Sequence, residues 1–305
     1  MKKLIFTFVF ISILGIFQGN ANEQTERTVV AVNGLNLRES PTLEAEVITS
    51  VPFLDRVTLL NEAVSETDTL GAVDFSDFID GTFTDYIVGE WVKVQYHNKE
   101  GYVFNAYLMQ EYLDEPLHSA ESEYAIAFAG WDCVDNIHRN KDLQWKGLFQ
   151  TSSGYEMRVV ELEYYMDVDE MGAWYATITQ SNDFPLFVIG AVADKFKSGA
   201  VKGTYFKDKW FLGHEQGVST IENLTINFLE NESFLTINEG NQQQKIALSE
   251  GVQIIWKGDL DGDGKDDYLF TAGEESNSVN LYLSSEAAEG ELVKQVASYY
   301  PGYCC

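Results

Sequence analysis

The sequence predicts a mainly β protein that is built from two domains. Short runs of alternating apolar and polar residues are typical of strands, and they recur along the chain between Gly, Asn and Asp residues. No stretch has a long helical period, and 305 residues are enough for two domains. We therefore expect a small β-barrel over residues 28–112, a polar linker over 113–123, and a second, mostly β domain over 124–305.

Residues 1–21 have the order of a secretory signal peptide. Two lysines at positions 2 and 3 precede an uncharged, mostly apolar run over 4–17, and small residues follow. The run is shorter than the roughly 20 residues that span a bilayer. The first cysteine, Cys133, lies far from the cleavage point, so we expect no lipoprotein anchor. The prediction is a periplasmic or secreted protein with no membrane insertion once the signal is removed.

The charge of the chain argues against partners that bind through a basic surface. The formal net charge is -28, although charged residues make up only 22% of the chain. Nucleic acids and anionic membranes both require a basic surface, which a chain with this balance lacks. We therefore expect no nucleic-acid binding, and an acidic surface that attracts cations.

The first domain contains a series of short predicted strands. Asn33-Gly34 is a tight-turn signal, and residues 91–104 form a predicted hairpin in which Val92 and Val94 share one face. Together these features predict a small all-β barrel. Its expected strands are 29–32, 35–38, 47–51, 56–60, 91–96 and 102–104.

Three motifs of this domain resemble those of the bacterial SH3-like family. They are LNLRESP at 35–41, GEWVKV at 89–94 and KEGYVF at 99–104, in the order usual for that family. The resemblance covers about residues 28–112. It implies an exported or wall-associated barrel whose partner is peptidoglycan or an envelope protein.

An acidic insertion over residues 64–88 departs from the family pattern. It holds six Asp and Glu residues with three phenylalanines between them, where the family has a short connection. A long loop in a compact barrel is either functional or disordered. A functional loop here would cover or replace the usual ligand groove.

The second domain is predicted to consist of strands separated by turns, with one short helix near 191–197. The expected strands are 157–165, 174–179, 186–192, 225–229 and 234–237. Three more, near 252–256, 268–270 and 281–285, and a further segment over 291–294, surround an acidic loop at 259–267.

The acidic loop has the spacing D-x-D-x-D-G-x-x-D, which is dense in carboxylates. Carboxylates about 4 Å apart repel by roughly 1 kcal/mol in water. A hard divalent cation turns this repulsion into coordination by oxygen atoms, so the loop predicts bound Ca²⁺. The predicted ligands are the carboxylates of Asp259, Asp261, Asp263 and Asp267 and the backbone carbonyl of Lys265.

The surroundings of the loop indicate which kind of calcium site it is. An EF-hand requires Glu at the twelfth position, but Phe270 stands there and the flanks are strand-like. The loop instead resembles the calcium loops of FG-GAP repeats, in which strands flank the ion. A solvated acidic turn without an ion is the alternative. No base close in the sequence supports catalysis, so we expect a structural ion.

Three cysteines leave two functions open. An oxidising compartment allows a disulfide from Cys133 to Cys304 or Cys305, with an unbridged Cys133 as the alternative. The principal hypothesis is a non-enzymatic binding protein of the bacterial envelope. The second is a cell-wall hydrolase of the cysteine peptidase type, in which Cys133 is the nucleophile beside His138 or His214.

Overall fold

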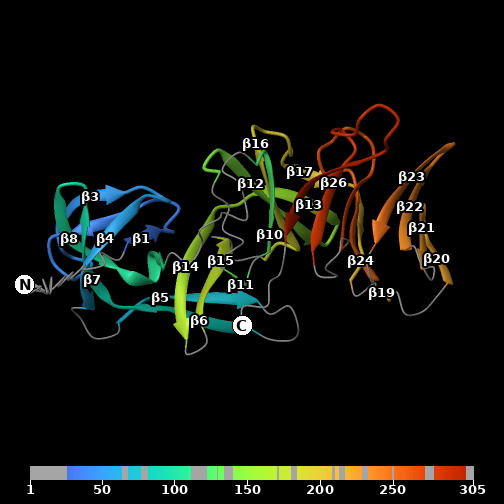
Figure 1. Ribbon diagram of the computed structural model, residues 1–305. Helices are drawn as coiled ribbons and strands as arrows, with labels where there is room; N and C mark the ends of the chain where they lie inside the picture. The colour runs from blue at the N-terminus through green and yellow to red at the C-terminus, as the bar shows by residue number, and fades with distance from the viewer. Residues whose placement is uncertain are drawn as a thin grey trace, which may run out of the picture.

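The computed structural model is built almost entirely of strands, arranged in several sheets (Figure 1). Among the described residues the only helical element is the 3-10 turn η1 (Asn105–Tyr107). The prediction of a mainly β fold is confirmed. The described residues are 26–63, 68–76, 82–110, 122–128, 130–133, 140–169, 172–179, 184–207, 210–212, 217–228, 233–248, 251–271 and 278–299.

The first domain is a barrel-like sheet of seven strands in the order β3-β2-β8-β7-β4-β1-β9. Its core is apolar, and Val29, Leu37, Val94 and Val103 are fully buried within it. Five of the six strands predicted here have a counterpart in the sheet, whereas the one predicted over 29–32 shares only Val29 with the first strand, because a turn begins at Val32. The strands are β1 (Glu26–Val29), β2 (Leu35–Arg38), β3 (Val47–Val51), β4 (Arg56–Ala63), β7 (Trp91–Tyr96), β8 (Lys99–Phe104) and β9 (Leu108–Gln110).

Most of the acidic insertion forms a two-stranded antiparallel ribbon. Strand β5 (Asp68–Ser76) pairs with β6 (Thr82–Gly89), and Phe75 is the register partner of Phe83. Residue types that favour strands, such as Val73 and Phe75 in β5 and Phe83 and Ile87 in β6, account for this pairing. The insertion is therefore an ordered ribbon over these two strands, rather than a loop.

The half of the second domain nearer the barrel contains two sheets. The five-stranded sheet has the order β10-β16-β12-β13-β17, and the three-stranded sheet has the order β11-β15-β14. The strands are β10 (Tyr124–Ala127), β11 (Gly130–Cys133), β12 (Leu143–Thr151), β13 (Gly154–Val159), β14 (Leu162–Asp169), β15 (Gly172–Thr179), β16 (Phe187–Val192) and β17 (Gly199–Val201).

The C-terminal half contains a six-stranded and a four-stranded sheet. Strands β24, β25 and β26 lie in the middle, with apolar clusters on both faces of their sheet. Every residue of β25 and β26 is buried. The strands are β18 (Gly203–Tyr205), β19 (Trp210–Leu212), β20 (Gly217–Ile221), β21 (Leu224–Phe228), β22 (Ser233–Glu239), β23 (Gln242–Leu248), β24 (Gly251–Gly258), β25 (Asp267–Thr271), β26 (Val279–Leu283) and β27 (Lys294–Tyr299).

Two sequence predictions for the second domain are wrong. The strand expected over 157–165 is interrupted at Val160, whose N–H donates to the Trp145 carbonyl, and β13 and β14 on either side belong to different sheets. The helix expected over 191–197 is absent from this described segment. Ala193 has a φ of 65°, outside the helical region, and the buried Lys146 ammonium binds the Phe196 carbonyl.

The barrel and the second domain share a buried apolar cluster. Val30 and Phe53 of the barrel pack with Leu162 and Tyr164 of β14. The Phe53 and Tyr164 rings stack with centroids 6.1 Å apart and planes at 8°. This contact fixes β14 against the barrel.

Candidate functional site

The acidic loop connects the ends of two central strands, β24 and β25, and folds around its own carboxylates. Asp259 accepts hydrogen bonds from the N–H groups of Gly262 (2.7 Å) and Gly264 (3.1 Å). Asp261 and Asp263 accept from the N–H groups two residues further on, at 3.1 Å and 2.8 Å. Gly262 and Gly264 have φ values of 81° and 90°, which glycine adopts without strain.

Asp267 is the anchor between the loop and the buried sheet. Its side chain is fully buried and accepts hydrogen bonds from Leu260 N–H (2.8 Å), Ser284 N–H (2.8 Å) and Ser284 Oγ (3.0 Å). Burial, followed by the charge of Asp261, raises the pKa of Asp267 to about 7, although these hydrogen bonds act in the opposite direction. No Lys or Arg side chain contributes to this pKa shift, so no protein cation offsets the negative charge of the carboxylate there.

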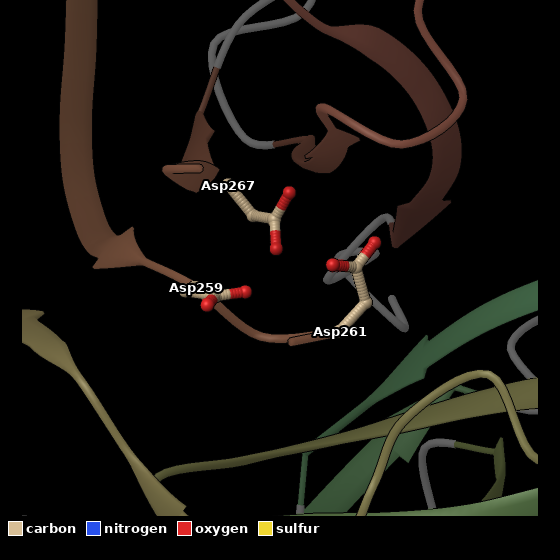
Figure 2. Close-up of side chains that lie close together, drawn as sticks. All are labelled: Asp259, Asp261 and Asp267. Atoms are coloured by element: carbon tan, nitrogen blue, oxygen red, sulfur yellow. The ribbon is translucent and has the colours of Figure 1, made fainter. Parts of the chain in front are cut away.

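Three of the predicted ligand residues converge in space. Asp259, Asp261 and Asp267 each offer a carboxylate oxygen, and these oxygens lie within 4.8 Å of one another (Figure 2). Oxygen-only donors at this density fit a hard cation such as Ca²⁺. Asp263 lies outside this group of three, and its Oδ2 accepts a hydrogen bond from Ser284 Oγ at 2.9 Å. The role of the Lys265 carbonyl stays a prediction.

Two serines at the loop were missed by the sequence analysis. Ser284 donates to Asp263 and Asp267, and Ser285 Oγ donates to Asp261 Oδ2. Both follow β26, the neighbour of β25 in the sheet. No local signal in the sequence identifies them, because only the pairing of β25 with β26 brings them to the loop.

The cysteine predictions lie largely outside the described residues. Cys133 is the last residue of β11, but its side chain is outside the described part. His138, His214, Cys304 and Cys305 also fall outside the described residues. The disulfide and the hydrolase constellation therefore stay predictions.

A second candidate site is a hollow of about 260 Å³ where the barrel meets the second domain. We call it the junction hollow. Gly34, at its edge, has a φ of 84°, and a Cβ there would lie 2.7 Å from Ser50 Oγ, so the turn requires glycine. The polar and aromatic residues that line the hollow are Asn33, Asn36, Arg38, Trp91, Phe104, Tyr107, Glu163 and Tyr164.

The junction hollow combines aromatic surface with charge. Trp91 packs edge-on against Phe104, with ring centroids 5.7 Å apart. Arg38 Nη1 donates to the Ala45 carbonyl at 2.8 Å, which orients the guanidinium group. Burial, and then the negative charge of Glu163, raises the pKa of Tyr107. A few polar groups among apolar walls are characteristic of ligand sites.

The hollows continue along the seam between the two domains. Two neighbouring ones, of about 650 Å³ and about 460 Å³, share the Val32-Asn33 turn, Leu143, Trp145 and Leu162. Of the described hollows, these three surround the same turn of the barrel. The turn therefore lies at the centre of the concave surface between the domains.

Comparison with protein families identifies the class of the first domain. Residues 33–109 match the bacterial SH3 domain, so the resemblance drawn from its motifs is confirmed over this part of the chain. The matched residues include the lining of the junction hollow from Asn33 to Tyr107, but not Ala31, Val32, Glu163 or Tyr164. No curated protein and no solved structure matches the chain.

The same comparisons leave the FG-GAP resemblance of the acidic loop as a prediction. Within the described residues, no helix combines the length and the apolar character that crossing a membrane requires.

Proposed function

We propose that this protein is an exported, non-enzymatic binding protein of the bacterial envelope, and that its SH3 domain binds peptidoglycan or an envelope protein. The bacterial SH3 match carries the proposal, because such domains are binding modules that suggest a cell-wall ligand. The aromatic and charged lining of the junction hollow supports a ligand site on this barrel. The signal peptide predicted at 1–21 supports export to the periplasm or beyond.

Co-sedimentation with purified, insoluble peptidoglycan tests the binding function. We expect the mature protein to pellet saturably with the wall material. A variant in which a short turn replaces residues 64–88 tests whether the ribbon covers the binding site. If the ribbon covers the site, this variant binds peptidoglycan more tightly than the mature protein does. If neither protein co-sediments, peptidoglycan is not the ligand and the proposed function is wrong for this polymer.

The proposal includes a structural Ca²⁺ ion in the acidic loop. Asp259, Asp261 and Asp267 would hold it directly, with Asp263 and the Lys265 carbonyl completing the oxygen shell. The ion would neutralise the mutual repulsion of these carboxylates. Extracellular sites bind calcium with dissociation constants near 10⁻⁴ M, so about 1 mM ion stabilises the fold by about 1.4 kcal/mol. The convergence of three carboxylates supports the site.

Asp261→Ala tests the ion without emptying a buried position. In excess calcium we expect this variant to unfold several degrees below wild type, because a ligand is lost. In EDTA the difference disappears or reverses, since removing Asp261 relieves repulsion with its neighbours. Thermal unfolding monitored by circular dichroism measures both. The exposed Glu289→Gln serves as a control of equal charge change. Equal melting of Asp261→Ala and wild type in calcium would contradict the site.

A further inference from the structure

The largest hollow on the seam belongs almost wholly to the second domain. Its volume of about 650 Å³ is within the range of roughly 300–1,000 Å³ that is usual for ligand sites. The barrel contributes only Val32 and Asn33 to it, and every other lining residue lies between Leu143 and Ser198. The residues that match the bacterial SH3 domain end at 109, so the hollow lies outside that domain except at Asn33. We call it the second-domain hollow.

The second-domain hollow offers an aromatic and apolar surface to a ligand. Trp145 is half-buried, and its ring lies so close to Gly190 that a Cβ there would be 2.9 Å from the nearest ring carbon. The sheet therefore sets the position of the ring. Two further lining residues, Val32 and Val159, are 37% and 70% exposed. Together these side chains form a surface on which the C–H groups of a ligand can pack.

Asp194 is a fixed hydrogen-bond acceptor in this hollow. The ammonium group of the 5%-exposed Lys146 donates to Asp194 Oδ1 at 2.5 Å and to the Phe196 carbonyl. The Asp194 side chain is nevertheless 68% exposed, and its Oδ2 receives no hydrogen bond from any residue that the structure describes. Since the buried ammonium group holds one oxygen, the other is oriented to accept a hydrogen bond from a ligand.

The other polar side chains of the hollow are exposed and include both donors and acceptors. Glu161 supplies a second carboxylate, which only accepts. Asn33 and Gln144 carry amides that both donate and accept, and Ser198 adds a hydroxyl group. The hollow therefore presents mixed hydrogen-bonding groups beside its apolar surface.

The charges of the hollow restrict the ligand class. Lys146 is already paired with Asp194, and no other Lys or Arg is among the described lining residues, so an anionic ligand would meet two carboxylates and no uncommitted cation. Among the described residues, the carboxylates that converge in a group of three are those of the acidic loop, which excludes Asp194 and Glu161. A neutral ligand that is rich in hydroxyl groups matches both the mixed donors and acceptors and the indole ring.

We propose that the second-domain hollow binds a neutral oligosaccharide. The C–H face of a sugar ring packs on Trp145. Sugar hydroxyl groups donate to Asp194 and Glu161 and accept from the amides of Asn33 and Gln144. The site is separate from the junction hollow, so the second domain has a binding function of its own, whichever ligand the SH3 domain takes.

Titration calorimetry of the mature protein with neutral tetrasaccharides tests the ligand class. The probes are cellotetraose, maltotetraose and tetra-N-acetylchitotetraose, which differ in linkage and in N-acetylation. We expect at least one of them to bind saturably. A polyethylene glycol of similar mass is the control probe, and it should not bind because it lacks hydroxyl groups along its chain.

Three variants locate the binding site. The double variant Gln144→Ala, Glu161→Ala removes two exposed polar groups and should bind the best probe at least about tenfold more weakly. Trp145→Phe keeps an aromatic ring in the packed position but reduces its surface, and it should bind about two- to tenfold more weakly. The matched control Gln242→Ala, Glu289→Ala changes the same residue types at exposed positions outside the hollow and should bind as wild type.

The outcomes separate this inference from the proposed function. Absence of saturable binding of all three tetrasaccharides up to about 10 mM would overturn the inference. Unchanged affinity in the Gln144 and Glu161 double variant would also overturn it, because the sugar would then bind elsewhere; circular dichroism verifies the fold of each variant. Peptidoglycan binding without tetrasaccharide binding would leave the proposed function intact and refute the oligosaccharide site alone.

Discussion

Below the Asp267 pKa of about 7, Asp267→Ala is expected to lower the free energy of unfolding by about 3–5 kcal/mol, even when no cation is added. The substitution leaves the buried N–H groups of Leu260 and Ser284 without the acceptor that both now share. Each unsatisfied buried donor costs about 1–3 kcal/mol. In buffer that contains calcium, the variant also loses a ligand of the ion, so the difference in unfolding free energy between variant and wild type becomes larger. Urea unfolding in EDTA and in calcium measures both contributions. The neighbouring Asp266→Ala removes only a half-exposed ion pair with Lys257 and should cost less than about 1 kcal/mol.

The pH dependence of the metal-free protein provides a second signature of Asp267. Its pKa is about 7 in the folded protein against 3.8 for a free carboxyl, so the folded state retains the proton to higher pH than the unfolded state. The free energy of unfolding should therefore fall as the pH rises from about 4 to about 7, by up to about 4 kcal/mol from this group, and then level off. Asp267→Ala should lack this component. A wild-type stability that rises across this range in EDTA, with no difference from the variant, would contradict the assignment.

Gly258→Ala is expected to destabilise the C-terminal half by about 3–5 kcal/mol. A Cβ at this position would lie 2.3 Å from the Lys202 carbonyl oxygen and 2.4 Å from Gly203 Cα, which are backbone atoms at the start of β18. The φ of 155° adds strain for any residue with a side chain. To relieve this contact the backbone at Lys202 and Gly203 must shift. Because Asp259 N–H donates to the same Lys202 carbonyl, the shift also moves the first residue of the acidic loop. Overpacking costs about 1–3 kcal/mol and backbone strain about 1–2 kcal/mol.

Gly264→Ala is the matched control for this substitution. Gly264 has a φ of 90°, but a Cβ there meets no atom within 4 Å. It should cost only the conformational strain, about 1–2 kcal/mol. Chemical unfolding of both variants in EDTA isolates the steric effect from calcium binding. Equal destabilisation by the two variants would show that contact with β18 is not what Gly258 avoids.

The barrel was largely predictable because its signals are local. The alternation over 91–96, the Asn33-Gly34 turn and the motif at 35–41 each depend on neighbouring residues, and the strands form where they predict. The ribbon formed by β5 and β6 was harder to foresee. Its pairing is antiparallel and local, but it occupies a place where the family has only a short connection.

The errors in the second domain arise from contacts distant in sequence. Residues 157–165 have an unbroken β pattern, yet Val160 binds the Trp145 carbonyl and the chain passes from one sheet to another. The segment after Val192 is shaped by Lys146, which binds both Asp194 and the Phe196 carbonyl. Neither contact can be read from the residues in the affected segment.

The residues of the candidate sites also differ in whether a local sequence pattern could identify them. The carboxylates at 259, 261 and 267 lie within one short loop, so their spacing identified them. Ser284 reaches the loop only because β26 pairs with β25, and Glu163 reaches the SH3 barrel only because Tyr164 stacks on Phe53. These partners depend on topology, which no local pattern reports.

One measurement tests the central proposal of binding without catalysis. Purified peptidoglycan is incubated with the mature protein, and bound protein and soluble wall fragments are quantified in the same samples over time. The proposed function predicts saturable binding and no release of fragments above that of a protein-free control. Release of fragments that is abolished by Cys133→Ala or His214→Ala would contradict it and establish the cell-wall hydrolase instead.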